Sequence, residues 1–130
     1  MDPVTSDDLL KAARSAVPEV DLADLKARRG DPAVAVLDVR DSAEVASGKI
    51  PGACHAQRGM LEFYLDRGSD FFLPALEGKT EVIMVCGSGG RAALAAKLAR
   101  DMGWSASYLG GGMKAWRAAG EPTEPGEPAT

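Results

Sequence analysis

The feature that most constrains the fold is an apolar run that stops at a cysteine and passes through a glycine-rich loop into an alanine-rich segment. The apolar run is Val82–Val85, and the loop is Cys86–Arg91. A short apolar run with β-branched residues is typical of a strand buried on both faces of a parallel sheet. Residues 92–102 then change to a helical period. The apolar face of that segment is expected to consist of Leu94, Leu98 and Met102, with Ala95 and Ala99 beside them. The stretch therefore predicts strand, loop and helix.

The loop between the predicted strand and helix, residues 86–91 and called the Cys86 loop below, is expected to hold an ionised thiol. Its small residues allow successive backbone N–H groups to curl inward around an anion. These residues are Gly87, Ser88, Gly89 and Gly90. The helix adds its positive end, and Arg91 adds a permanent charge. Cysteines in such surroundings ionise more readily than a free thiol, so Cys86 is expected to be largely thiolate at neutral pH. The alternative is an inert core cysteine followed by a tight turn.

Three other functions of a glycine-rich loop are tested by its neighbours. Residues 87–92 fit the dinucleotide fingerprint, but no acidic residue follows at the distance needed to bind a ribose. A serine hydrolase needs a Gly-x-Ser-x-Gly elbow and a later histidine, but position 86 is cysteine and no histidine follows Ser88. A nucleotide-binding Walker loop needs Gly-Lys-Ser/Thr, which does not follow.

Composition excludes several classes of protein. The chain has 130 residues and 45% hydrophobic content, as expected for one domain, and a net charge of −4 argues against nucleic acid as a partner. No apolar stretch resembles a signal peptide or a membrane span, so we expect no membrane partner and a cytoplasmic location. Two distant cysteines and one histidine predict neither a disulfide framework nor a metal site.

The remaining segments are interpreted mainly as structural. Residues 1–17 predict a helix capped by Thr5 or Ser6, and residues 121–130 predict a disordered tail because they are rich in glutamate, glycine and proline. The segment Ala33–Val39 predicts a second central strand.

Several polar residues near the predicted strand ends are weighed as site candidates. Asp38 is expected to pair with backbone amides or with Arg40. Cys54 is expected in the core, and His55 as a structural group more than as a base. Arg58 could help to attract an anion or could be a solvated surface residue.

Four motifs in this order closely resemble single-domain rhodaneses over residues 18–120. They are Leu37–Arg40, Gly48–Ala53, Cys86–Arg91 and Gly111–Trp116. The resemblance implies an α/β domain whose mostly parallel five-stranded sheet is flanked by helices on both faces. It also implies sulfurtransferase chemistry, with Cys86 forming a persulfide, Gly87–Gly90 supplying amides and Arg91 closing the loop. No metal or organic cofactor is implied.

The mechanism expected from this resemblance is a two-step sulfur exchange. The Cys86 thiolate would take the outer sulfur of thiosulfate or a persulfide, and cyanide or a thiol would then accept it. Two rivals are a cysteine-based phosphatase or arsenate reductase and a non-catalytic binding module. The loop argues against both, because binding modules of the family often lack the cysteine and the related phosphatases have five residues, not four, between cysteine and arginine.

Overall fold

The computed structural model describes residues 2–126. The helices are α1 (Ser6–Ala16), α2 (Leu22–Arg28), α3 (Ser42–Ala46), α4 (Leu61–Tyr64), α5 (Gly90–Asp101) and α6 (Gly112–Ala118). The strands are β1 (Glu19–Val20), β2 (Val34–Asp38), β3 (Cys54–His55), β4 (Glu81–Val85) and β5 (Ser105–Leu109). Two short 3₁₀ helices, η1 (Arg58–Met60) and η2 (Pro74–Leu76), lie in the connection from β3 to β4.

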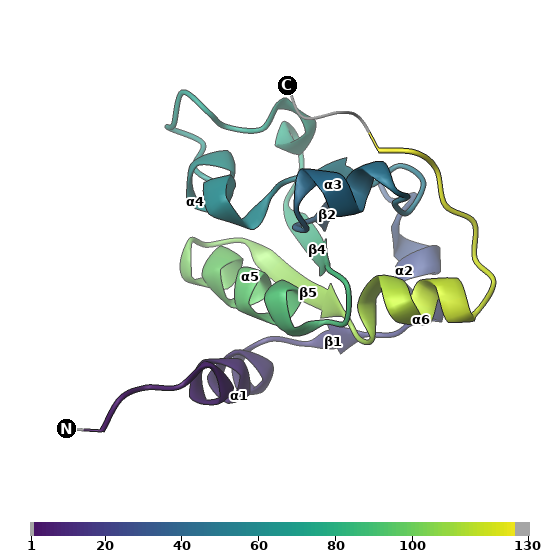
Figure 1. The fold of residues 1–130 in the computed structure, drawn as a ribbon. Coiled ribbons are helices and arrows are strands. Elements are labelled where there is room, and N and C mark those ends of the chain that lie inside the picture. Colours follow the sequence, from purple (N-terminus) through teal and green to yellow (C-terminus); the bar gives the residue numbers. More distant parts are fainter. Residues whose placement is uncertain (1, 127–130) are drawn as a thin grey trace.

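A five-stranded sheet in the order β1-β5-β4-β2-β3 forms the centre of the molecule (Figure 1). Every pair of neighbouring strands is parallel. The two apolar runs seen in the sequence are the adjacent central strands β2 and β4, and all of β2 is buried. Because the strands are parallel, their carboxyl ends meet at one edge, where the Cys86 loop begins. The predicted α/β class and parallel sheet are confirmed.

Helices cover both faces of the sheet (Figure 1). One core cluster contains Ala13 of α1, Leu61 of α4 and Ala96 of α5. The cluster on the other face contains Leu25 of α2 and Trp116 of α6. This two-layer burial explains why the central strands are apolar throughout instead of alternating with polar residues.

Helix α5 buries only part of the face that the sequence predicted, namely Ala95 and Ala99, together with other alanines. The buried residues are its alanines, Ala92, Ala93, Ala95, Ala96 and Ala99. Leu94 and Leu98 are only half-buried at the edge of the core, and Met102 is 38% exposed. The small alanine side chains allow the helix axis to approach β4 and β5 closely, so the leucines lie at the margin of that contact.

Helix α1 lies along α5 (Figure 1). The predicted cap is confirmed, since Thr5 and Asp8 form a reciprocal capping box at its amino end. A methyl group of Leu10 comes within 3.5 Å of the position that a Cβ on Gly90 would occupy. The amino-terminal helix therefore packs against the first residue of α5, directly beside the Cys86 loop.

Residues 121–126 differ from the disorder predicted for the whole of 121–130. Glu124 and Lys49 form an antiparallel bridge with backbone hydrogen bonds of 2.9 and 3.0 Å. The Glu124 carboxylate also accepts hydrogen bonds from Lys49 Nζ and the Gly52 amide, and the Trp116 indole donates to the carbonyl of Pro122. The composition of this segment could not predict these pairings, because they join residues far apart in the sequence. Residues 127–130 lie outside the described part of the chain.

Candidate active site

Cys86 lies at the carboxyl end of β4 and is 1% exposed. The Cys86 loop turns at Gly89, which has a φ of +112° and caps the amino end of α5. This turn brings two backbone amides onto the sulfur, with Sγ accepting hydrogen bonds from Gly89 N at 3.1 Å and Ala92 N at 3.3 Å. Both donors and the positive end of α5 therefore direct positive partial charge at the Cys86 sulfur.

The carbonyl groups of the same loop are held by α6. The amides of Met113 and Lys114 donate to the carbonyls of Cys86 and Gly87 at 2.8 and 3.0 Å. Gly112 makes this contact possible, because a Cβ at that position would lie 2.3 Å from the Cys86 oxygen. The amino end of α6 therefore holds the loop carbonyls, while the amides of Gly89 and Ala92 point at the sulfur.

Arg91 lies beside the loop and forms a two-pronged ion pair with Glu44 of α3. Its Nη1 and Nη2 atoms donate to the two carboxylate oxygens at 2.8 and 3.0 Å. The guanidinium also approaches the loop, since Nη2 lies 3.3 Å from the position of a Cβ on Gly87. The hydrogen bond to Arg91 lowers the pKa of Glu44, and the same bond raises the pKa of Arg91.

Glu44 was not predicted from the sequence as part of this site. Glu44 is 47 residues from Arg91, and the signal available was only its position in a short helix after the Asp38 strand. Carboxyl-end loops of adjacent parallel strands meet at the same edge of the sheet, which is the one feature that could have suggested the pair.

The other predicted site residues are less closely engaged. Ser88 is exposed at the tip of the loop, and Gly90 begins α5. Arg58 forms an ion pair with Glu62 at 3.0 Å, one turn along the chain, and within residues 2–126 it makes no hydrogen bond to the Cys86 loop.

The polar residues at the end of β2 form a buried structural network, as the sequence predicted for Asp38. Arg40 makes a forked ion pair with Asp38, with Nη2–Oδ2 and Nε–Oδ1 distances of 2.8 and 3.0 Å, and both side chains are buried. Arg40 also donates to the carbonyl of Gly48 at 2.8 Å. His55 Nε2 lies 2.8 Å from the carbonyl oxygen of Arg40, which supports its structural interpretation.

Cys54 is half-buried at the edge strand β3, not fully in the core as predicted. Burial raises the pKa of the Cys54 thiol, which favours its neutral form. The two cysteines are both free thiols in different surroundings.

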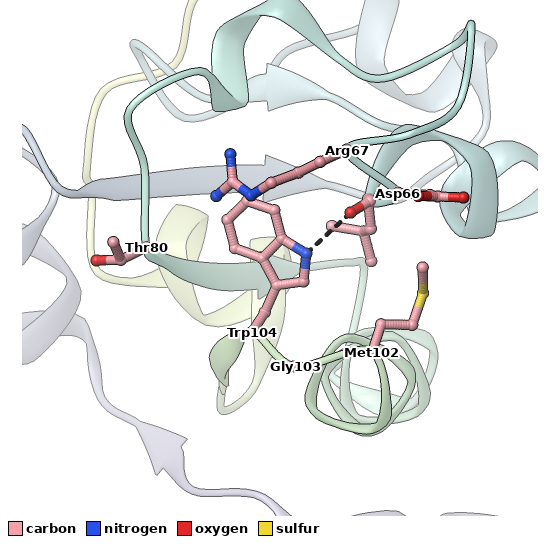
Figure 2. Close-up of a pocket in the computed structure, with 7 residues that line it drawn as sticks. Asp66, Arg67, Thr80, Met102, Gly103 and Trp104 are labelled. Atoms are coloured by element: carbon pink, nitrogen blue, oxygen red, sulfur yellow. Dashed lines mark hydrogen bonds between the residues drawn. The ribbon is translucent and has the colours of Figure 1, made fainter.

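A pocket of about 410 Å³ lies at the amino ends of the strands, opposite to the end that holds the Cys86 loop (Figure 2). Thr80 and Trp104, which line it, directly precede β4 and β5, whereas Cys86 directly follows β4. The guanidinium of Arg67 lies 4.5 Å from the Trp104 ring centroid, and the indole donates to the carbonyl of Leu65. This pocket is therefore separate from the thiol.

Residues 21–119 match the rhodanese-like domain family, and the chain belongs to that family. The solved structure of a Rhodopseudomonas palustris protein of unknown function, described there as a possible tyrosine phosphatase, is 36% identical with a TM-score of 0.86, and the match covers 95% of this chain and 97% of that one. A thiosulfate sulfurtransferase from Pseudomonas aeruginosa is 33% identical with a TM-score of 0.72, covering 85% of this chain and 20% of that one. YtwF of Bacillus subtilis, a suggested sulfurtransferase, is 29% identical over 107 residues, which are 82% of this chain and 96% of YtwF.

The family therefore includes proteins named as sulfurtransferases, and the resemblance drawn from the motifs is confirmed. Within residues 2–126, α5 and the other helices are too short or too polar to cross a bilayer.

Proposed function

We propose that this protein is a sulfurtransferase that carries a sulfane sulfur as a persulfide on Cys86. The observation that carries the proposal is the pair of amides from Gly89 and Ala92 that converge on a nearly inaccessible cysteine sulfur. These donors can stabilise negative charge on the sulfur without a neighbouring base, and the chain's one histidine, His55, is already bound to the backbone.

The proposed first step is attack by the Cys86 thiolate on the outer sulfur of a donor such as thiosulfate. A bond forms between Cys86 Sγ and that sulfur, the donor's S–S bond breaks, and sulfite leaves with the electron pair. The terminal sulfur of the persulfide then carries the negative charge, which the loop amides can stabilise as they stabilise the thiolate. In the second step a thiol or cyanide attacks that terminal sulfur and releases the Cys86 thiolate.

A cysteine-based phosphatase is the second candidate, because the Rhodopseudomonas palustris structure is described as a possible tyrosine phosphatase. Two features of this chain support sulfur transfer instead. Only four residues separate Cys86 from Arg91, which makes a narrow ring for a phosphoryl group with three equatorial oxygens. Aryl phosphate cleavage also benefits from a general acid, and the carboxyl group that contacts Arg91, that of Glu44, has a lowered pKa and is a poor proton donor.

Mass spectrometry of the intact protein tests the proposal. After incubation with thiosulfate, the protein should be one sulfur atom heavier, and cyanide should remove that atom as thiocyanate. Cys86→Ser should do neither, whereas the matched variant Cys54→Ser should still gain and lose the sulfur. Release of phosphate from an aryl phosphate with no sulfur gain would favour the phosphatase. Neither reaction across several donors would favour a binding module.

A further inference from the structure

The guanidinium of Arg91, which lies at the Cys86 loop, is already bound to a carboxylate of the protein. Glu44 faces the guanidinium with both oxygens, and the two side chains are 38% and 42% exposed. The pair therefore lies at the accessible rim of the loop, where a donor anion would approach. Arg91 keeps its positive charge, but the Glu44 carboxylate offsets that charge and binds both terminal nitrogens. Fewer N–H groups of Arg91 are then available to a second anion.

The other charges near this rim are mostly negative. The hydrogen bond that Arg91 donates to Glu44 is the largest cause of the raised pKa of Arg91, and the charges of Glu44, Cys86 and Asp41 raise it further. Asp41 is the residue that caps the amino end of α3, beside Glu44. Arg40 directly precedes Asp41, but its charge is paired with that of Asp38. One guanidinium is thus opposed by two carboxylates and a thiolate.

This balance matters most for a donor with two negative charges. Thiosulfate brings a charge of −2 toward the Cys86 thiolate and Glu44, whereas an organic persulfide, RSSH or its anion, brings at most one negative charge at the reacting group. In the persulfide reaction, Cys86 Sγ bonds to the outer sulfur of RSSH, the RS–S bond breaks, the thiolate RS⁻ leaves, and the proton stays on the transferred sulfur.

We propose that Glu44 is a specificity-determining residue that neutralises Arg91 and thereby directs Cys86 toward sulfur donors with at most one negative charge, such as organic persulfides, and away from dianionic thiosulfate. Glu44 acts through Arg91 and does not itself contact the sulfur. The inference rests on the proposed sulfur transfer and assigns the class of donor to the same loop.

Two donors of almost the same shape separate charge from other properties. Thiosulfate and methanethiosulfonate both present an outer sulfur on an S–S bond, but a methyl group replaces one charged oxygen in the second, which is a monoanion. The measurement is the rate of sulfur loading on Cys86, followed by mass spectrometry in single-turnover reactions. In Glu44→Gln, loss of one negative charge should raise the rate about tenfold with thiosulfate and about threefold with methanethiosulfonate at low ionic strength. The difference should shrink at high salt, because the rim is exposed to solvent.

Asp101→Asn is the matched control, because it also removes one carboxylate from an exposed ion pair but at the far end of α5. It should leave the ratio of the two rates unchanged. Melting curves of both variants check that they are folded, and Glu44→Ala shows whether Arg91 needs a polar partner to stay in place.

The loading rates with the two donors decide whether the proposal holds. A selective gain with thiosulfate in Glu44→Gln supports the proposal. An equal change with both donors, in either direction, or no change at all overturns it, since Glu44 would then only position Arg91 or only stabilise the fold. If the unmodified protein gains no sulfur from either donor, the proposed function itself fails. That result is distinguishable from normal loading with an unchanged donor ratio.

Discussion

The contact between α6 and the Cys86 loop can be tested with a single methyl group at Gly112. An alanine Cβ there would lie 2.3 Å from the Cys86 oxygen and 2.7 Å from the Gly87 oxygen, whereas ordinary contacts begin at 3.4 Å. The loop and the helix would have to separate by about 1 Å. The hydrogen bonds from Met113 and Lys114 to those carbonyls would then be stretched or lost.

The expected loss of stability in Gly112→Ala follows from two contributions. Gly112 has a φ of +55°, and a residue with a Cβ in this left-handed region loses roughly 1–2 kcal/mol. The two weakened hydrogen bonds add about 0.5–1.5 kcal/mol each, so the free energy of unfolding should fall by about 2–5 kcal/mol. Sulfur loading should slow by about a hundredfold, because a displacement of about 1 Å moves the amides away from the sulfur.

Gly120→Ala is the control for this experiment. Gly120 has a φ of +73°, but no atom lies within 4 Å of its would-be Cβ. It carries the backbone strain without the collision, so it should lose roughly 1–2 kcal/mol and keep its rate of sulfur loading. Urea denaturation and single-turnover mass spectrometry measure the two effects. If Gly112→Ala behaved like Gly120→Ala in both assays, the idea that α6 positions the loop would be refuted.

Three further substitutions test separate parts of the structure. Arg91→Ala should slow sulfur loading from thiosulfate without unfolding the domain, and Arg91→Lys should restore only part of the rate because lysine lacks the planar fork; unchanged kinetics in both would assign the arginine to surface structure. Asp38→Asn leaves the buried Arg40 without its counter-ion and should lower the free energy of unfolding by about 3–5 kcal/mol, seen as a much lower melting temperature; a loss below about 1 kcal/mol would contradict this. Ser107→Ala should stabilise the domain by about 1 kcal/mol in urea denaturation, because the Ser107 hydroxyl is buried without a partner in the described chain; a destabilised variant would mean that the hydroxyl is bound.

Local sequence signals predicted the elements that depend on neighbouring residues. Thr5 caps α1 as expected, because a cap needs only the next three residues. The strands β2 and β4 were found because burial on both faces leaves continuous apolar runs. The position of Cys86 at a strand end beside a helix amino end followed from the same signals.

Features that depend on distant parts of the chain were not predicted. The face of α5 was only partly predicted, because alanines and leucines both recur at helical spacing and only the closeness of the sheet decides which of them are buried. Glu44 was missed because its partner Arg91 is 47 residues away, and Glu124 because Lys49 is 75 residues away. Composition correctly identified the polar character of residues 121–126, but one carboxylate with two donors and a pair of backbone hydrogen bonds hold this segment in place.

The bridge between Lys49 and Glu124 also has a mechanical consequence. A pull on the chain beyond residue 126 would load Glu124 and its bonds to Lys49 and Gly52 before it reached α6. The strain would thus pass first to the turn before β3, at the edge of the sheet. The bridge thus shields α6 from a pull on the chain beyond residue 126. It also shields the α6 amides that hold the carbonyls of Cys86 and Gly87.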